Sequence, residues 1–262
     1  MSSSETIIEV DSLTMAYGSF VLQRDLSFTV KRGDVFIIMG GSGCGKSTLL
    51  RHLVGLNRPA SGTVSIMGAP LRGDSQSAEG RRVLRRLGVM YQSGALWSSM
   101  TLAENIALPL EEYTTLSSSK IRQTAALKLS LVGLNGFEDY YPSEISGGMR
   151  KRAALARAMA LDPDVLFLDE PSAGLDPLSA RNLDELILQL RGTLGTTFVI
   201  VTHELASIFT VGTDSIFLDP QLKTMRAQGN PRELLENSKD PVIRAFLTRG
   251  EDTGNASTEG RV

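Results

Sequence analysis

Residues 35–48 read VFIIMGGSGCGKST, and this stretch decides the fold. The continuous apolar run VFIIM is typical of a strand that is covered on both faces. It leads into the pattern G-x-x-x-x-G-K-[ST], here Gly40, Gly41, Ser42, Gly43, Cys44, Gly45, Lys46 and Ser47. A helix-like stretch, STLLRHLVGL, follows and ends near Gly55. A strand, a glycine-rich turn and a helix in this order predict an α/β domain with a phosphate-binding loop.

The residue types in this loop suit the binding of a phosphate chain. Consecutive backbone N–H groups must approach the phosphates, and side chains would obstruct the wrapped loop, so glycine dominates. The helix beginning near Lys46 directs the positive end of its dipole at the anion. Lys46 is expected to neutralise β- and γ-phosphate oxygens, and the Ser47 hydroxyl to ligate Mg²⁺. The plain alternative is a glycine-rich turn without a ligand.

An acidic partner for the loop follows a second buried-strand pattern, VLFLDE at residues 165–170. Asp169 comes at the carboxyl end of this strand, where open α/β sheets bind their ligands. We expect Asp169 to hold the Mg²⁺ shell through water. Glu170 is a candidate general base that orients and deprotonates the water attacking the γ-phosphate. The alternative is two surface acids at the end of a strand.

A Ser-Gly-Gly turn, Ser146 to Gly148, precedes the strongly periodic helix pattern RKRAALARAMAL. Such a turn at a helix start is a second anion-binding arrangement, and its alternative is a plain N-cap with flexible glycines. A single phosphate-binding fold has no use for two such helix ends on one nucleotide. Two copies of the chain facing head to tail would use both.

Hydrophobic patterns place the remaining elements. Strands are expected at residues 6–30 (broken at Tyr17-Gly18), 64–67, 88–91, 197–202 and 215–218. Helices are expected at residues 95–110, 121–134 and 149–161, and after the Asp176-Pro177 and Asn230-Pro231 pairs, each read as N-cap and first helical residue. The sequence therefore predicts an α/β core interrupted by a helical insertion. A small, polar tail from Gly250 is expected to be disordered.

Composition narrows the function classes. The 262 residues carry 27 Lys and Arg against 29 Asp and Glu, and this balance argues against a nucleic-acid binder. One cysteine excludes an internal disulfide and suits a reducing compartment. No apolar run approaches the roughly 18–20 residues of a membrane span, and the N-terminus lacks the order of a secretory signal. The expectation is a cytoplasmic protein that would work with a membrane only from outside it.

These ordered motifs make residues 5–245 resemble the ATP-binding subunits of ABC transporters. The resemblance implies one ATP-binding domain in which a RecA-like P-loop NTPase core carries an antiparallel β subdomain. The core and β subdomain would comprise residues 5–92 and 162–245, with an inserted α-helical subdomain at 93–161 and a polar tail at 250–262. It also implies ATP and Mg²⁺ as cofactors and ATP hydrolysis as the activity.

The same resemblance assigns roles at the nucleotide. Tyr17 lies where the family stacks adenine, although by itself it is an ordinary turn aromatic. Gly40 to Thr48 correspond to Walker A. Gln92 resembles the Q-loop glutamine, which reaches Mg²⁺ and the attacking water. Ser146, Gly147 and Gly148 resemble the signature that reads the γ-phosphate across a dimer.

The resemblance assigns further roles to residues that follow the signature in the sequence. Asp169 and Glu170 resemble Walker B and the catalytic carboxylate. Residues 172–176, SAGLD, resemble the D-loop with one residue more than the commoner SALD, and Asp176 is expected at the nucleotide. His203 resembles the switch histidine that contacts the γ-phosphate, whereas a lone histidine at a strand end is more often structural.

A narrower resemblance connects the chain to the ATPases of Mce-type lipid transport systems of Gram-negative bacteria. It is based on QSGALW at 92–97, ENIALPL at 104–110, PSEISGGM at 142–149 and RAALARA at 152–158. Met149 stands where most ABC subunits carry glutamine. The resemblance implies two ATPases with two permease chains, a STAS-domain protein and an Mce-domain ring. Phospholipids or other lipids would move between the inner and outer membranes, with the ATPase on the cytoplasmic face of the inner membrane.

Four further features carry hypotheses. Trp97 and Leu96 are expected to line the groove for a permease coupling helix, unless Trp97 is a core aromatic. A basic cluster, with i,i+4 pairs on one helix face, is either a solvated face or a contact for anionic lipid headgroups; its members are Arg81, Arg82, Arg85 and Arg86. Cys44, at a helix N-terminus, is expected to have a lowered thiol pKa that favours the reactive thiolate; the alternative is a small residue tolerated at a variable position. His52 is expected to be a packing residue.

Three alternatives remain for the function. A non-transport ABC ATPase acting on ribosomes or DNA usually has two cassettes or a long coiled coil, and the charge balance argues against it. A P-loop kinase would leave the Ser-Gly-Gly turn and Glu170 unexplained. An ABC ATPase for another substrate, such as an amino acid, differs from the lipid hypothesis only in its permease.

Overall fold

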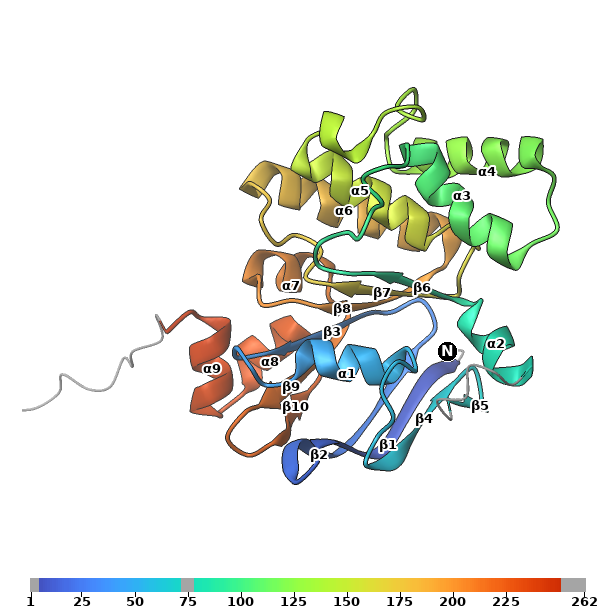
Figure 1. Ribbon diagram of the computed structural model, residues 1–262. Helices are drawn as coiled ribbons and strands as arrows, with labels where there is room; N and C mark the ends of the chain where they lie inside the picture. The colour runs from blue at the N-terminus through green and yellow to red at the C-terminus, as the bar shows by residue number, and fades with distance from the viewer. Residues whose placement is uncertain (1–4, 72–77, 251–262) are drawn as a thin grey trace, which may run out of the picture.

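The computed structural model describes residues 5–71 and 78–250, and its centre is a six-stranded sheet (Figure 1). The strand order is β10-β9-β3-β8-β7-β6, and every neighbouring pair is parallel except β10 and β9. In chain order the strands are β3 (Val35–Gly40), β6 (Leu87–Met90), β7 (Val165–Asp169), β8 (Thr197–Val201), β9 (Asp214–Asp219) and β10 (Thr224–Gln228). Since parallel strands end at the same edge, the residues that follow β3, β7 and β8 come together there.

One face of the central sheet is covered by helix α1 (Lys46–Leu53) and a second sheet. The second sheet is antiparallel, in the order β2-β1-β4-β5. Its strands are β1 (Thr6–Tyr17), β2 (Phe20–Lys31), β4 (Ser61–Ile66) and β5 (Ala69–Pro70). Phe28 of β2 stacks on Phe36 of β3 with ring centroids 5.4 Å apart. One apolar core therefore joins the two sheets around α1.

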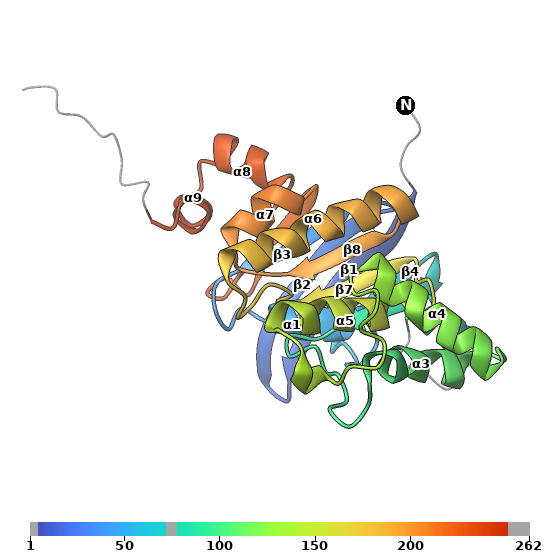
Figure 2. The ribbon, with the colours of Figure 1, turned by 90° about the horizontal axis from the view of Figure 1, so that it is seen from above.

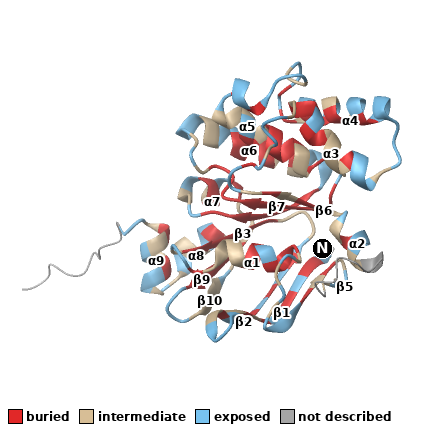
Figure 3. Ribbon diagram, in the orientation of Figure 1, coloured by how far each residue is buried: buried red, intermediate tan, exposed pale blue. Residues whose placement is uncertain are grey.

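The opposite face packs against helices and forms a second core. These helices are α3 (Leu102–Tyr113), α4 (Ser118–Leu131), α5 (Gly147–Ala158) and α6 (Pro177–Leu194). Strands β3, β7 and β8 are buried along their whole length between the two layers (Figure 3). Complete burial explains why their sequences are continuous apolar runs instead of alternating patterns.

Shorter helices complete the described chain: α2 (Ala78–Leu84), α7 (Leu205–Val211), α8 (Pro231–Asn237), α9 (Pro241–Leu247) and the 3-10 turn η1 (Pro142–Glu144). Helices α3 and α4 extend at the end of the molecule opposite to α8 and α9 (Figure 2). Among residues 5–71 and 78–250, none of the helices has the length and apolar character needed to cross a bilayer.

The structure confirms the predicted α/β class with an antiparallel sheet and an inserted group of helices. Asp176 and Asn230 are the N-caps of α6 and α8, as the Asp-Pro and Asn-Pro pairs predicted. The expected helix at 95–110 is wrong at its start, because Thr101 forms a capping box with Glu104 and α3 begins at Leu102. Strand β10 and helix α9 were not predicted. Apart from Gly250, the predicted polar tail lies outside the described residues.

The basic cluster is only partly helical. Helix α2 ends at Leu84, so the expected i,i+4 pairs do not continue on one helix face. Arg86 instead forms an ion pair with Asp164, which precedes β7, and its Nη2 lies 2.8 Å from Asp164 Oδ1. Arg85 lies over the ring of Tyr113 at 5.6 Å from the centroid. Contacts with residues far away in sequence therefore hold the side chains of Arg85 and Arg86.

Candidate functional site

The loop between β3 and α1 needs glycine at two positions. Gly40 has a φ of +149°, and a Cβ there would lie 2.5 Å from the carbonyl oxygen of Leu218 in β9. Gly45 is the N-cap of α1 with a φ of +98°, and its Cβ would lie 2.9 Å from Leu22 Cδ2. Both conformations disfavour any residue with a side chain. The glycines therefore let the backbone curl closely in front of α1.

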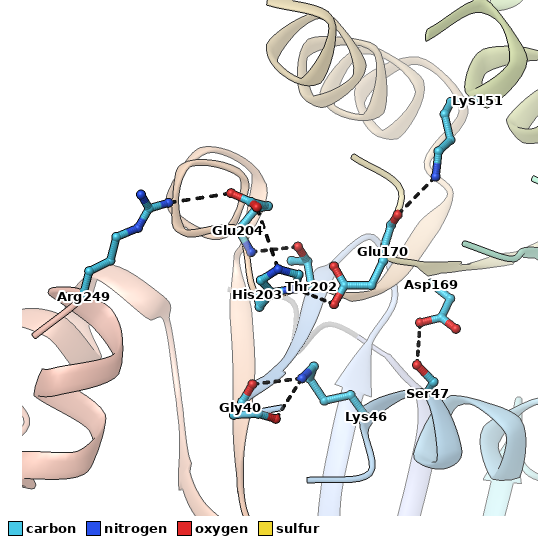
Figure 4. Close-up of polar contacts among 11 residues, drawn as sticks. Gly40, Lys46, Ser47, Lys151, Asp169, Glu170, Thr202, His203, Glu204 and Arg249 are labelled. Carbon is cyan, nitrogen blue, oxygen red and sulfur yellow. Dashed lines mark hydrogen bonds and ion pairs between the residues drawn. The ribbon is translucent and has the colours of Figure 1, made fainter. Parts of the chain in front are cut away.

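Lys46 and Ser47 are held at the start of α1 by short polar contacts (Figure 4). The Lys46 ammonium donates hydrogen bonds to the carbonyls of Gly40 at 2.9 Å and Gly41 at 3.1 Å. The Ser47 hydroxyl donates to Asp169 Oδ1 at 2.8 Å. Asp169 ends β7 and is buried. Lys46 and two of the three predicted metal ligands, Ser47 and Asp169, therefore lie together at the start of α1.

Glu170 and His203 form a second pair beside the loop. His203 Nδ1 lies 2.8 Å from Glu170 Oε1 (Figure 4). Glu170 follows β7 with a φ of +47°, and its N–H donates to the carbonyl of Val201 at the end of β8. Its second oxygen, Oε2, is buried and has no hydrogen-bond partner within the described chain. A carboxylate with one free oxygen in this place can accept a proton from a water molecule.

A cavity of about 760 Å³ joins these groups. The predicted residues that line it are Gly40, Gly41, Ser42, Gly43, Gly45, Lys46, Ser47, Thr48, Gln92, Glu170 and His203. Gln92 reaches it from the segment after β6. The structure therefore assembles these residues in one cavity from four separate stretches of chain, at the edge where parallel strands end.

Some predicted residues lie elsewhere. Tyr17 ends β1, is 56% exposed and does not line the cavity. Ser146 and Gly148 line a different cavity of about 480 Å³, between α5 and α6. Ser146 caps α5 by accepting a hydrogen bond from the Met149 N–H at 3.2 Å. Asp176 caps α6. Within one chain, therefore, the Ser-Gly-Gly turn is not part of the phosphate cavity.

The prediction for the Cys44 thiol is wrong. Cys44 is 1% exposed, and burial raises the pKa of its thiol, outweighing the nearby Lys46 charge that lowers it. The thiol points into the core between the two sheets instead of toward the phosphate cavity. His52, by contrast, is buried as expected, with Nδ1 2.8 Å from the carbonyl of Thr48.

Two basic residues of α5 were missed. The Lys151 ammonium is buried and donates to the carbonyls of Gln92 and Glu170, the latter at 3.4 Å. Burial lowers the pKa of Lys151. Arg157 donates to the carbonyls of Ala95 at 2.6 Å and Gly94 at 3.2 Å. The helical period of the sequence predicted that both residues lie in a helix. It did not predict these contacts with loops that are far away in sequence.

The C-terminal helix α9 also reaches the cavity, through Ala245, Phe246 and the following Arg249. Arg249 Nη2 lies 3.7 Å from Glu204, which follows His203 (Figure 4). Sequence patterns gave no sign of this contact.

Trp97 is 61% exposed, so the alternative that it is a core aromatic is wrong. Leu96 packs against the core on the helical side of the central sheet.

Comparison with known proteins agrees with this geometry. Residues 23–173 match the family model described as ABC transporter. The chain is 41% identical over 240 residues to the probable ribonucleotide transport ATP-binding protein mkl of Mycobacterium tuberculosis, covering 92% of this chain but only 66% of that protein. It is 38% identical over 251 residues to the intermembrane phospholipid transport system ATP-binding protein MlaF of Haemophilus influenzae, covering 96% and 93%.

Solved structures of ABC proteins are also similar to this chain. The ATP-binding cassette MJ0796, in a dimeric post-hydrolysis state bound to ADP and Pi, superposes with a TM-score of 0.75 at 27% identity, covering 86% of this chain and 98% of that one. CbiO1 of Clostridium perfringens, part of the ABC transporter complex cbiONQ, gives 0.80 at 28% identity, covering 94% and 96%. The kinase alternative is therefore wrong, and the chain belongs to the ABC transporter family as an ATP-binding subunit that hydrolyses ATP.

Proposed function

We propose that this ATPase energises lipid transport, with phospholipid as the substrate class, between the inner and outer membranes of a Gram-negative bacterium. The observation that carries the proposal is the nearly end-to-end match to MlaF, which covers 96% of this chain and 93% of that protein. This chain also carries the QSGALW segment and Met149 of the Mce-type pattern. Transport of another substrate class is the second candidate, because the mycobacterial relatives are named for ribonucleotide transport.

The proposed active unit is a dimer in which each ATP lies between two copies. It is supported by the separation, within one chain, of the phosphate cavity from the cavity that Ser146 and Gly148 line. The partner copy would supply its Ser-Gly-Gly turn and D-loop Asp176 to the γ-phosphate side. The similar ABC transporter cassette MJ0796 has a dimeric structure. Closure would depend on contacts to nucleotide that exist only in the closed state.

The predicted site residues would each have a separate role in ATP binding or hydrolysis. Lys46 would exchange its bonds to the Gly40 and Gly41 carbonyls for phosphate oxygens. Glu170 would take the proton of the attacking water, using the Oε2 atom that lacks a partner within the described chain. His203 would orient Glu170 and contact the γ-phosphate, and Gln92 would orient the water. Tyr17 would stack on adenine from the edge of β1.

The Ser47 hydroxyl and the Asp169 carboxylate fit Mg²⁺. They are hard oxygen donors 2.8 Å apart beside the phosphate loop, and Mg²⁺ is commonly held by one or two protein oxygens together with phosphates and water. Gln92 would complete the protein side of the shell. When bound, Mg²⁺ would neutralise phosphate charge and help to align the phosphate chain. Hydrolysis would then depend mainly on positioning and charge neutralisation.

A groove for the permease is proposed between the helical layer and the central sheet. A cavity of about 610 Å³ lies there, lined by residues of α2, β6, α3 and α5, including Tyr113, and by Arg85, which follows α2. Trp97 and Leu96, which were expected to line such a groove, do not line this cavity. The exposed Trp97 remains a proposed contact for a coupling helix. On this proposal the ATPase is peripheral, at the cytoplasmic face of the inner membrane.

We also propose that residues 93–161 form the helical subdomain of a single domain spanning 5–245.

The proposed partners are a membrane permease resembling MlaE, a STAS-domain protein resembling MlaB and an Mce-domain protein resembling MlaD. The test is purification of the tagged ATPase from native membranes in mild detergent, followed by mass spectrometry of proteins and lipids. We expect a polytopic permease, an Mce-domain protein and enriched phospholipid. Recovery of an amino-acid or ribonucleotide permease with a soluble binding protein would overturn the lipid assignment and leave the ATPase assignment intact.

A further inference from the structure

Gln23 is a fully buried amide on β2 that contacts the phosphate loop. Its Nε2 donates to the carbonyl of Cys44 at 2.8 Å and to the carbonyl of Asp219 at 3.1 Å. Its exposed fraction is 0%, and its Oε1 has no hydrogen-bond partner within the described residues. A buried oxygen without a partner lowers stability, so an apolar side chain would fill this space at lower cost. The amide therefore points to a role for its two N–H groups.

The bond to Cys44 fixes the orientation of one peptide unit. The Cys44 carbonyl and the Gly45 N–H belong to the same planar trans peptide, so they point in opposite directions. With the carbonyl held by Gln23 on β2, the Gly45 N–H points away from Gln23. Consecutive N–H groups of this loop are the groups that receive the phosphates.

The neighbouring residues hold β2 firmly against the loop. Leu22 lines the phosphate cavity and lies so close to Gly45 that a Cβ there would be 2.9 Å from its Cδ2. The Arg24 N–H donates to the carbonyl of Lys223 in the turn between β9 and β10 at 2.8 Å. Gln23 itself reaches Asp219 at the end of β9. Its amide is therefore held from both sheets and cannot shift independently of them.

We infer that Gln23 is a positioning residue for nucleotide binding, which acts by presenting the Gly45 N–H to the phosphate chain. The inference depends on ATP binding alone and not on the transported substrate. Without the two donors, the Cys44 peptide is free to rotate, and the loop must be reordered each time nucleotide binds. Nucleotide affinity falls, whereas hydrolysis at saturating ATP changes little, because Glu170, His203 and Asp169 are untouched.

The test uses Gln23→Met, which keeps a similar length and volume but has no donor. Since a hydrogen bond to a charged group is worth about a tenfold to hundredfold change in affinity, we expect the Kd of MgATP and MgADP to rise by at least about tenfold. The kcat at saturating ATP should stay within about threefold. The amide proton of Gly45, followed by NMR in ¹⁵N-labelled protein, should shift in the nucleotide-free state.

Thr197→Val is the matched control. Thr197 is also fully buried, and its hydroxyl accepts a hydrogen bond from the Gly33 N–H at 3.0 Å, away from the loop. The control should lose thermal stability without a change in nucleotide Kd. Gln23→Asn, whose amide is one methylene too short, serves if the methionine variant does not fold and should weaken binding in the same way. A folded Gln23 variant with a Kd within twofold of wild type, or an equal loss in Thr197→Val, would overturn the inference.

Discussion

Replacement of Asp184 by asparagine should change how stability depends on pH. Asp184 lies on α6, is 5% exposed and accepts a hydrogen bond from the Ser207 hydroxyl of α7 at 2.8 Å. Burial raises the pKa of its carboxyl to about 6 from an ordinary value of 3.8, although the Ser207 hydrogen bond acts in the opposite direction. The folded protein therefore binds a proton at Asp184 more readily than the unfolded chain does.

The sign and size of the effect follow from this difference. Below about pH 4 the carboxyl is protonated in both states, and its contribution to stability is fully present. Between about pH 4 and pH 6 the unfolded chain releases this proton while the folded state keeps it, so the free energy of unfolding decreases, and above about pH 6 the contribution levels off. The difference between about 6 and 3.8 corresponds to about 3 kcal/mol at most. For a domain of this size, that equals roughly 6–12 °C in Tm.

The assay is urea unfolding of wild type and Asp184→Asn without nucleotide, from pH 4 to pH 8. Asparagine is neutral throughout and can still accept the Ser207 hydrogen bond, so the variant should gain stability relative to wild type as the pH rises. Subtracting the two curves removes the contribution of all other titrating groups. Ser207→Ala is the companion variant, and it should steepen the loss of stability at high pH. Parallel curves for wild type and Asp184→Asn would refute the reasoning.

The remaining predictions concern the nucleotide site and the permease. Glu170→Gln should lower ATP hydrolysis by about 10²–10⁴ and prolong ATP-bound dimers, as measured by turnover and gel filtration; near-normal turnover would contradict its role as the base. Lys46→Ala should abolish measurable ATP binding in calorimetry, and unchanged affinity would remove Lys46 from the site. A bulky maleimide should label Cys44 slowly in the native state, more slowly still with ATP, and block nucleotide binding once attached; labelling at the rate seen in urea would contradict its burial. Trp97→Ala should retain the ATPase activity of the isolated chain but lose co-purification with the permease; loss of neither would remove Trp97 from the docking surface.

Local patterns predicted most elements because the forces behind them are local. Continuous apolar runs identified β3, β7 and β8, and the Asp-Pro pair identified the start of α6, since each depends on residues within a few positions. The helix expected from residue 95 failed for a related reason. Apolar residues before Thr101 continued the helical pattern, so the helix was expected to begin at residue 95. The capping box at Thr101 instead makes Leu102 the first residue of α3.

Sequence by itself determined the phosphate loop, its likeness to ABC ATPases and the acidic residues at the end of β7. Those features are written in contiguous residues whose spacing follows from the geometry of one strand, one turn and one helix. Only the tertiary structure decided that Cys44 is buried, that Lys151 supports Gln92, and that the Gln23 amide holds the loop. Gln23 is 21 residues from Cys44 and 196 from Asp219. Such contacts depend on how two sheets pack against each other, and no local pattern specifies that packing.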